Sequence, residues 1–392
     1  MRKYALVLSG GGFKGAFQVG ALKYLQNNWD KIDPDGNEMK FDIITGVSVG
    51  ALNGYLVAAN QFDELENIWK NIALNGVSEI YTSDFIDTDS PSDKLQLKID
   101  AKKLIKKLLP NLQIKLSLWA GLGILISKSK KQQFIDDLLS KAEDDLRSNL
   151  KNFKAIADYT PLKEKLKKLV KTSAIEENCT FKSGFVSLND GQYYSIRQDE
   201  FDSDEDFQNA ILASAAMPII WEPVPQIKSR KHQLKNSIDG GLRNVSPLGD
   251  VIDEINADET DADYTIIIIN CNNGTVEKKE FDEANIAQIA LRALTDISLS
   301  EIFNNDLREF LRINNIIEQT KTACPNLKLL NYDFQKQSSS KAVLKSFNAI
   351  LIQPDTDSLG DTLVANKKLH TVRLDQGKKM AKLALEQLPL LV

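Results

Sequence analysis

The sequence has few of the residues that build disulfide frameworks or metal sites. Its three cysteines, Cys179, Cys271 and Cys324, are far apart in 392 residues and never form a CxxC pair. Their number and spacing suggest neither a disulfide framework nor a zinc site, and they fit a reducing compartment. It contains no HExxH motif, no EF-hand loop and no cluster of Cys and His. The sequence therefore implies no metal and no cofactor.

Long apolar stretches are also missing. A membrane-spanning helix needs about 18 apolar residues or more, and no such stretch occurs. The apolar part of MRKYALVLSGGG is too short and too β-like for a signal peptide. The chain is 42% hydrophobic and 26% charged, as in ordinary soluble globular proteins. We expect a cytoplasmic protein, long enough for one large α/β domain or two ordinary ones.

Charge is distributed unevenly along the chain. Residues 94–171 hold 19 lysines and arginines against 8 aspartates and glutamates, whereas the whole chain has a net charge of -5. Basic helical patterns there flank an apolar patch at 116–126 that is too short to span a bilayer. We interpret the stretch as an insertion or lid. It is either a surface for anionic lipid, with Trp119 as interfacial anchor, or a helical cap whose lysines face water. Nucleic acid is disfavoured, because stacking aromatics do not interleave with the basic residues.

Strand and helix patterns alternate from the N-terminus. Ala5–Leu8 is an uninterrupted apolar run that leads into three glycines, and a helical pattern follows. Residues 41–47 predict a second strand and residues 49–59 a second helix, an order typical of a parallel sheet covered on both faces. Later strands are expected at 180–188, 232–241, 263–272 and 347–354, and later helices at 279–318 and 361–388.

A serine lies between two glycines where the second strand pattern gives way to a helix pattern. Gly46, Ser48 and Gly50 match the GxSxG motif in the structural context that this motif requires. A sharp turn there projects the serine oxygen into open space, and the helix N-terminus favours negative charge on an attacked carbonyl. The motif indicates a nucleophile, and a turn that contains serine by chance is the alternative.

The first strand also runs into a glycine turn. Gly10, Gly12 and Gly15 satisfy GxGxxG, the pattern of dinucleotide-binding loops. That reading expects an acidic residue at the end of the second strand, where this chain has its serine turn. No GK[ST] follows, so a Walker phosphate loop is excluded. We therefore interpret the turn as free backbone donors beside Ser48, an oxyanion hole built from Gly11 and Gly12.

A nucleophilic serine needs a base, and the chain has only two histidines. Each of them, His232 in a charged run and His370 in a polar one, could complete a Ser-His-Asp triad. Asp239 is the alternative, because it follows a strand pattern and precedes two glycines, although Asp-Gly-Gly is also an ordinary turn. Aspartate is a weak base, so this role requires burial that raises its pKa. SxxK patterns at Ser127–Lys130 and Ser338–Lys341 lack the companion motifs of Ser-Lys enzymes.

Three motifs in order, GGGFKG, GVSVG and DGG, resemble those of the patatin-like phospholipase family. The stretch ILASAAMPIIWEPV at 211–224 is similar to the family's segment of small residues, proline and an aromatic ahead of the Asp motif. The resemblance spans about residues 4–250. It implies an α/β fold, a three-layer sandwich related to α/β-hydrolases with a parallel-rich central sheet flanked by helices. It also implies a single domain over 1–392, with 76–171 as a helical basic insertion or lid and 279–392 as a completion by helices and a strand.

The resemblance also implies a set of site residues. Ser48 would be the nucleophile and Asp239 the base of a dyad. The glycines Gly10 to Gly12 would form the oxyanion hole, with Gly11 and Gly12 as its preferred donors. Lys14 would meet a lipid phosphate or cap local carbonyls, and we favour the second role. The positions that support the motifs are Lys14, Gly15, Gly46, Gly50, Gly240 and Gly241.

The function that the resemblance implies is a lipid acyl hydrolase of the phospholipase A or lysophospholipase type. It would cleave carboxylic esters of glycerolipids through an acyl-enzyme, without a metal. Contact of residues 94–171 with an anionic membrane would make a cytoplasmic protein peripherally membrane-bound. A general esterase for neutral glycerides, and a non-catalytic lipid-binding or interaction protein on the same fold, are the alternatives.

Overall fold

A computed structural model describes the chain over residues 1–87, 154–260, 262–276, 278, 281–282, 284, 286–333, 337–355 and 359–387. Most of the basic insertion predicted at 76–171 lies outside these residues. The apolar patch at 116–126 with Trp119 and the SxxK pattern of Ser127–Lys130 are outside them too.

The central element is a mixed eight-stranded sheet. Its strands are β1 (Arg2–Leu8), β2 (Ile43–Val47), β3 (Thr180–Ser187), β4 (Tyr193–Arg197), β5 (Val224–Lys228), β6 (Gln233–Asp239), β7 (Asp263–Ile269) and β10 (Asn348–Ile352). They follow the order β10-β7-β1-β2-β3-β6-β5, and β4 also pairs with β3. The strands from β10 to β3 are parallel, whereas β4, β5 and β6 pair antiparallel. The parallel-rich sheet predicted from the sequence is confirmed.

Helices cover both faces of the sheet. They are α1 (Gly15–Gln26), α2 (Val49–Ala58), α3 (Phe62–Asn75), α7 (Thr160–Leu169), α8 (Asp204–Ser214), α9 (Leu248–Ala257), α10 (Ile286–Leu291), α11 (Leu299–Ala323) and α12 (Lys367–Glu386). A π-helical turn at Arg292–Ser298 joins α10 to α11, so the helix predicted at 279–318 is interrupted and ends later. The helix predicted at 361–388 begins only at Lys367, because Asn366 caps it by accepting the Leu369 amide at 2.8 Å.

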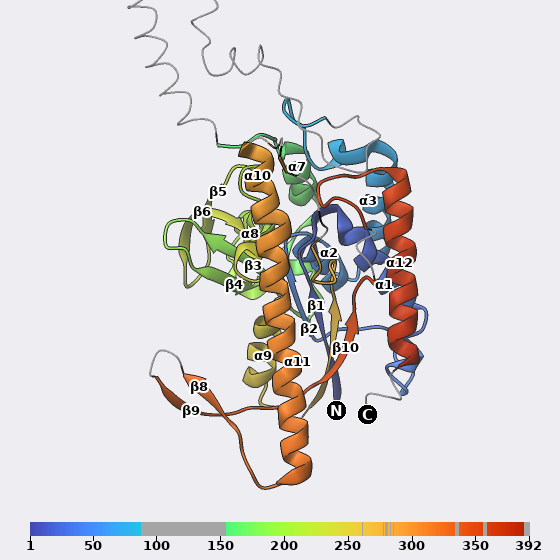
Figure 1. Ribbon diagram of the computed structural model, residues 1–392, viewed down its shortest axis with the longest axis vertical. Coiled ribbons are helices and arrows are strands. Elements are labelled where there is room, and N and C mark those ends of the chain that lie inside the picture. The colour runs from blue at the N-terminus through green and yellow to red at the C-terminus, as the bar shows by residue number, and fades with distance from the viewer. Residues whose placement is uncertain are drawn as a thin grey trace, which may run out of the picture.

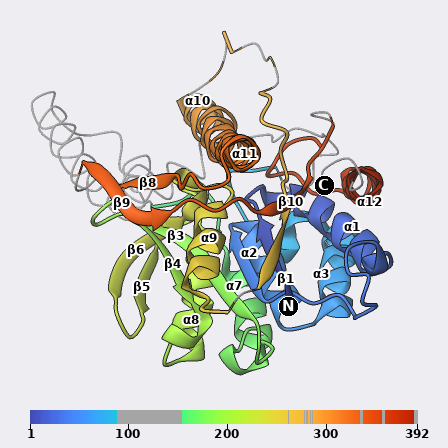
Figure 2. The ribbon, with the colours of Figure 1, turned by 90° about the horizontal axis from the view of Figure 1, so that it is seen from below.

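Alternate residues of the central strands enter two separate cores. Leu6 and Leu8 pack into the larger core with α1, α2, α8 and α12. Ala5 and Val7 point the other way and pack with α9 and α11. Strand side chains alternate between the faces, so one continuous apolar strand serves both layers. Figure 2 shows the result, with α11 and α8 on opposite sides of the strands, and the predicted three-layer architecture is confirmed.

Strand register brings two distant parts of the chain to the same level of the sheet. Val47, the last residue of β2, pairs with Gly184 of β3. Asp239, the last residue of β6, pairs with Phe185 on the other side of β3. Ser48 and Asp239 therefore flank the same level of β3, although 190 positions separate them in the sequence.

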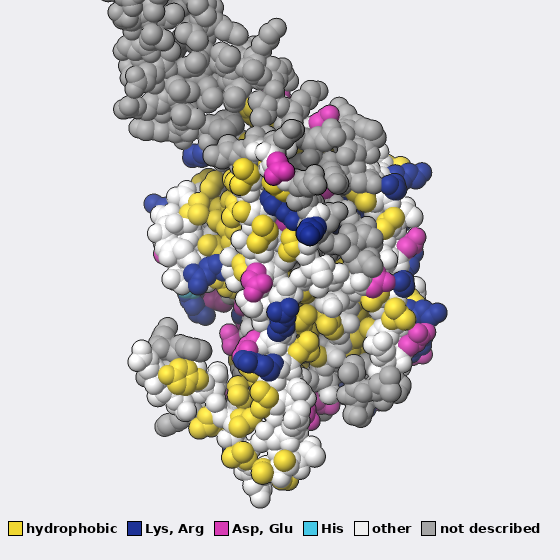
Figure 3. Space-filling model, in the orientation of Figure 1, with side chains coloured by type: hydrophobic (Ala, Val, Ile, Leu, Met, Phe, Trp, Pro, Cys, Tyr) yellow, Lys and Arg dark blue, Asp and Glu magenta, His cyan; other side chains and the backbone are white. Residues whose placement is uncertain are grey.

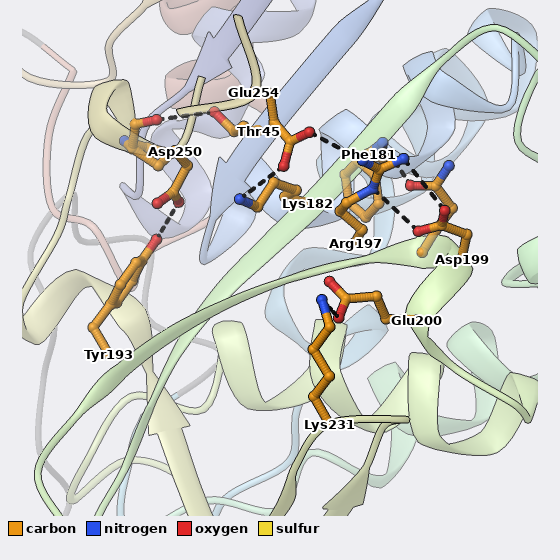
Figure 4. Close-up of polar contacts among 12 residues, drawn as sticks. Thr45, Phe181, Lys182, Tyr193, Arg197, Asp199, Glu200, Lys231, Asp250 and Glu254 are labelled. Carbon is orange, nitrogen blue, oxygen red and sulfur yellow. Dashed lines mark hydrogen bonds and ion pairs between the residues drawn. The ribbon is translucent and has the colours of Figure 1, made fainter. Parts of the chain in front are cut away.

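Polar side chains fasten α9 to the strands on the second face of the sheet (Figure 4). The Glu254 carboxylate contacts Lys182 of β3 at 3.1 Å and Arg197 of β4 at 3.3 Å. The Tyr193 hydroxyl donates to Asp250 at 2.7 Å. These contacts fix α9, the first α-helix after Asp239.

A second, two-stranded sheet projects from the body next to α11 (Figure 1). It consists of β8 (Leu330–Asp333) and β9 (Ser338–Val343). Hydrophobic side chains are exposed on this projection and on the neighbouring part of α11 (Figure 3). The exposed ones are Leu311, Ile316, Leu327, Leu330, Tyr332 and Val343. The SxxK pattern of Ser338–Lys341 thus lies on a projecting hairpin, at the end of the molecule where β1 begins.

Candidate active site

Ser48 occupies a strained turn between β2 and α2. Its φ of 57° and ψ of -128° lie outside the regions that non-glycine residues usually adopt. The glycines beside it permit this turn because larger residues would clash. A Cβ on Gly50 would lie 2.1 Å from the Leu8 carbonyl oxygen, and one on Gly46 would lie 2.2 Å from the Gly50 oxygen. The predicted GxSxG turn at the strand-to-helix junction is therefore present.

The segment at the end of α8 holds both candidate residues in place. Ser214 accepts the Ser48 amide at 2.9 Å and donates its own hydroxyl to the Gly184 carbonyl at 2.6 Å. The Asp239 amide donates to the Ala216 carbonyl at 3.0 Å. The stretch of small residues noted in the sequence therefore fixes the backbone on either side of β3.

Asp239 is buried and directed at Ser48. Its carboxyl lies within reach of the Ser48 side chain, which acts to lower its pKa, and its Oδ1 accepts the Gly241 amide at 2.8 Å. Gly240 lets the chain turn close to β3, because a Cβ there would lie 2.4 Å from the Gly184 oxygen. The serine and the carboxylate that the sequence singled out are thus brought together.

Burial sets the protonation of this carboxyl. Loss of solvent raises the pKa of Asp239 to about 7, against the smaller lowering effects of the Gly241 amide and the Ser48 side chain. A carboxyl with such a pKa is a much better proton acceptor than an exposed aspartate, and near neutral pH a large fraction of it is ionised. The pKa shift that the sequence analysis required for a catalytic aspartate is present.

The glycine turn after β1 lies next to Ser48. A Cβ on Gly10 would be 3.4 Å from the Ser48 Cβ. The Gly10 amide already donates to the Val245 carbonyl at 3.0 Å, so it is not available to a ligand. The amides of Gly11 and Gly12 donate to no acceptor among the residues that the structure describes. The turn therefore offers two donors rather than the three predicted.

Lys14 and Gly15 continue this turn into α1. The Lys14 side chain is largely buried, and its Nζ donates to Asn272 Oδ1 at 3.0 Å. This contact ties the turn to the segment that follows β7, in keeping with the structural role favoured for Lys14. Gly15 lets α1 approach the start of α2, since a Cβ there would lie 2.3 Å from Val49 Cγ2.

The two histidines lie in other surroundings. His370, on α12, stacks on Trp69 at a ring distance of 6.3 Å, and burial lowers its pKa. His232 lies between β5 and β6, with its ring edge-on to Tyr194 at 5.2 Å. Within the described part of the chain, neither imidazole hydrogen-bonds to Ser48 or Asp239. The geometry therefore favours the carboxylate over a Ser-His pair.

An apolar cavity of about 90 Å³ lies beside Ser48. Helices α2, α3, α7 and α8 form its walls, mainly with leucine, isoleucine, valine and tryptophan side chains. Representative lining residues are Leu52, Leu56, Leu65, Ile72, Leu162, Leu166, Ile211 and Trp221. No sequence motif marks this cavity, and its only signal in the sequence is the amphipathic pattern of the helices that line it.

The one buried amide in the cavity wall is already satisfied. Asn53 accepts the Trp69 indole N–H at 2.9 Å and donates to Gln18 Oε1 at 2.8 Å. Gln18 in turn donates to the Ser9 carbonyl at 2.9 Å. These bonds leave the wall apolar toward a ligand, and the cavity therefore suits a hydrocarbon chain.

The described ranges hold neither a candidate metal site nor a candidate membrane span. No group of three or more His, Cys, Asp or Glu side chains there is arranged to hold a metal ion. None of the helices in these ranges is long and apolar enough to cross a bilayer.

Comparisons with known proteins place the chain in a family. A family model described as patatin-like phospholipase matches residues 6–252, which include the glycine turn, Ser48 and Asp239. No curated protein matches the chain. Among solved structures, VipD from Legionella pneumophila is 13% identical over 98% of this chain and 67% of its own, with a TM-score of 0.37. The type III effector protein ExoU is 13% identical over 98% of this chain and 53% of its own, with a TM-score of 0.31. The family match covers more than half of the sequence, and the chain belongs to the patatin-like phospholipase family, a membership that supports lipid acyl hydrolysis as its general activity.

Proposed function

We propose that this protein is a lipid acyl hydrolase of the phospholipase A or lysophospholipase type, with Ser48 as nucleophile and Asp239 as base. The observation that carries the proposal is the proximity of these two side chains, beside two glycine amides that donate to no described acceptor and an apolar cavity. Nucleophile, base, oxyanion donors and a place for the acyl chain then lie within one site.

The geometry suits acyl transfer in two steps. Asp239 takes the Ser48 proton as Oγ attacks the ester carbonyl, and the amides of Gly11 and Gly12 stabilise the oxyanion that forms. The ester C–O bond then breaks, the lysolipid or alcohol leaves with that proton, and the acyl group stays on Ser48. Asp239 next takes a proton from water, which attacks the acyl-enzyme. The Ser48 oxygen leaves with the proton, and the fatty acid is released.

The cavity supports an acyl ester as substrate. Its walls are mainly hydrocarbon, and the Asn53 amide already donates to Gly15 and Gln18 and accepts from Trp69. An acyl chain in the cavity would place its carbonyl carbon beside Ser48, since Ser48 and Gly12 also line it. Binding energy from the chain then serves to orient the ester.

Helix α7 supports contact with an anionic membrane. Leu162 and Leu166 on one side of α7 line the cavity, whereas Lys163 and Lys168 are exposed. Exposed lysines near a lipid-binding cavity are attracted to an anionic surface by about 1 kcal/mol each. We therefore propose that α7 faces the lipid surface from which the substrate enters.

The dyad is tested with purified protein and a chromogenic acyl ester. Ser48→Ala should abolish ester hydrolysis and Asp239→Asn should lower it by about 10³-fold, while circular dichroism stays that of the wild type. A fluorophosphonate probe should label Ser48 in the wild type and not in Ser48→Ala. A wild type that neither hydrolyses the ester nor reacts with the probe would instead be a non-catalytic lipid-binding protein. Mass spectrometry of a phospholipid and glyceride panel then separates a phospholipase from a general esterase.

The membrane contact is tested with vesicles. The double variant Lys163→Glu, Lys168→Glu should lose binding to phosphatidylglycerol vesicles relative to the wild type. Lys378→Glu, Lys382→Glu on α12 is the matched control, because both lysines are exposed and distant in sequence from α7. Equal loss in both variants would mean that the attraction is a property of net charge and not of α7.

A further inference from the structure

The glycine turn with the proposed oxyanion donors is held by a segment outside the family match. Residues 359–364, the 359–364 loop, precede α12 and lie directly on this turn. The Phe13 amide donates to the Thr362 carbonyl at 2.9 Å. A Cβ on Gly12, whose φ is 52°, would lie only 2.5 Å from the same carbonyl oxygen. The loop thus fixes the peptide group that follows Gly12.

Arg373 of α12 joins this loop to the glycine turn. Its Nε donates to the Leu359 carbonyl at 2.8 Å, and its Nη2 donates to the Asp361 carbonyl at 2.8 Å. Its Nη1 donates to the Val364 carbonyl at 2.9 Å and to the Phe13 carbonyl at 3.2 Å. One planar guanidinium therefore binds three carbonyls of the loop and one of the turn.

An arginine at this position indicates that the side chain orients the carbonyl groups that it binds. Arg373 is 1% exposed, and a charged side chain is rarely buried so completely because its desolvation is costly. Its five N–H donors lie in a rigid fork, whereas the ammonium group of a lysine is a point donor. Apolar side chains would pack a helix against a loop equally well, but they would not set the direction of four carbonyls.

Packing of α12 against α1 holds Arg373 in a fixed position. It lies beside α1 in both ribbon views (Figures 1 and 2). A Cβ on Gly377 would lie 2.0 Å from the Phe17 carbonyl oxygen, and one on Gly20 would lie 2.1 Å from that of Leu374. The two backbones therefore touch at glycines, and α1 begins directly after the glycine turn. The position of Arg373 relative to the turn is set by this contact.

We propose that Arg373 is a positioning residue for the oxyanion hole. It fixes the 359–364 loop, whose Thr362 carbonyl holds the Phe13 amide, so that the amides of Gly11 and Gly12 face the ester carbonyl at Ser48. The inference rests on the proposed function, because it assumes acyl transfer at Ser48. It makes the segment after residue 252 part of the active-site machinery and not an appendage to it.

Misplaced oxyanion donors weaken the transition state more than the bound substrate. We therefore expect Arg373→Lys and Arg373→Ala to lower kcat by about 100-fold, the usual consequence of an error of about 1 Å in a catalytic group. KM should change by less than about threefold, because the acyl cavity still binds the chain. Simple destabilisation of α12 predicts no such division between kcat and KM in the molecules that stay folded.

The experiment uses the full chain and a chromogenic acyl ester. Arg373→Ala and Arg373→Lys are compared with Ala381→Gly, a control that destabilises the buried side of α12 and leaves the guanidinium in place. Kinetics are measured at a temperature where circular dichroism shows every variant to be folded. Millimolar guanidinium is then added to each, and it should restore kcat at least tenfold in Arg373→Ala alone.

The outcomes separate this inference from the proposed function. A kcat within twofold of the wild type in both arginine variants would overturn the inference. An equal loss in Ala381→Gly, with no recovery in guanidinium, would overturn it too, because stability alone would then explain the loss. If Arg373→Ala does not fold, the kcat of Arg373→Lys decides by the same criterion. A wild type that does not hydrolyse the ester or react with a fluorophosphonate would overturn the proposed function and the inference with it.

Discussion

Asp239 and Asp250 are both buried aspartates, and loss of solvent raises the pKa of each. They differ in what their oxygens contact. Asp239 lies close to Ser48 beside the apolar cavity. Asp250 lies on the other face of the sheet and accepts the Tyr193 hydroxyl at 2.7 Å (Figure 4). A raised pKa alone therefore does not identify a catalytic base. The base is the carboxyl whose neighbour can lose a proton to it.

Tyr193 is not such a neighbour. Loss of solvent and the negative charge of Asp250 hold the pKa of Tyr193 well above its ordinary value. The phenol therefore stays protonated and donates, and its contact with Asp250 is structural. Ser48, by contrast, lines a cavity that can hold a substrate.

The largest expected difference between the two aspartates is in activity. Asp239→Asn should lower kcat/KM for a chromogenic acyl ester by about 10³-fold, because an amide does not accept the Ser48 proton and a general base contributes 10² to 10⁴-fold. Asp250→Asn should stay within about threefold of the wild type, since the amide oxygen still accepts the Tyr193 hydroxyl. Equal losses in the two variants would remove the distinction and point to a shared effect on folding.

The pH dependence of stability is the next largest effect. The raised pKa of Asp239 means that the folded state holds its proton above pH 4, where the unfolded state has lost it. The contribution of the Asp239 carboxyl to the free energy of unfolding is therefore complete below about pH 4. It is lost as the pH rises through about 7. Three pH units correspond to about 4 kcal/mol. Urea unfolding at pH 4, 5.5, 7 and 8 should show this decline in the wild type and a smaller one in Asp239→Asn. Parallel curves for the two proteins would mean that the carboxyl is not perturbed.

The same carboxyl should govern the pH dependence of the rate. Only the ionised form of Asp239 accepts the Ser48 proton, so kcat/KM should rise with pH and level off above about 7. Between pH 7 and pH 5 the loss should be about 50-fold, approaching a slope of one proton at the acid end. The Asp250→Asn variant should give the same profile as the wild type. A midpoint shifted in that variant would show that the two sites are electrostatically coupled.

Local sequence predicted much of the fold and most of the site. The apolar run before three glycines and the GxSxG motif are short-range patterns, and both turns occur where they were expected. The strands β4 and β5 were not identified, because β4 is short and half-exposed and β5 contains Pro225. The sheet was therefore predicted with its parallel part intact and its antiparallel edge incomplete.

The properties that make the site reactive depend on contacts between distant segments. The pKa of Asp239 follows from its burial, and the pairing of both β2 and β6 with β3 places it beside Ser48. The Gly10 amide, which the motif alone predicts to be a third oxyanion donor, instead donates to the Val245 carbonyl. The 359–364 loop reaches the glycine turn through Thr362, some 350 positions away. A motif records residue types only. The pKa of Asp239, the hydrogen bond of the Gly10 amide and the contact of the 359–364 loop all depend on which distant groups pack against the motif residues.

The smallest effect concerns stability at the structural aspartate. Tyr193→Phe removes the hydroxyl and leaves the Asp250 oxygen without this donor in a buried place. An unsatisfied buried acceptor costs about 1–3 kcal/mol, so urea unfolding at pH 7 should show a loss in that range. The cost should shrink at acid pH, because a protonated Asp250 carries no charge to be stabilised. Ester hydrolysis should stay within twofold of the wild type, since neither side chain contacts the Ser48 site. A loss of activity larger than tenfold without a change in stability would place Tyr193 and Asp250 in the catalytic machinery and end the contrast between the two carboxylates.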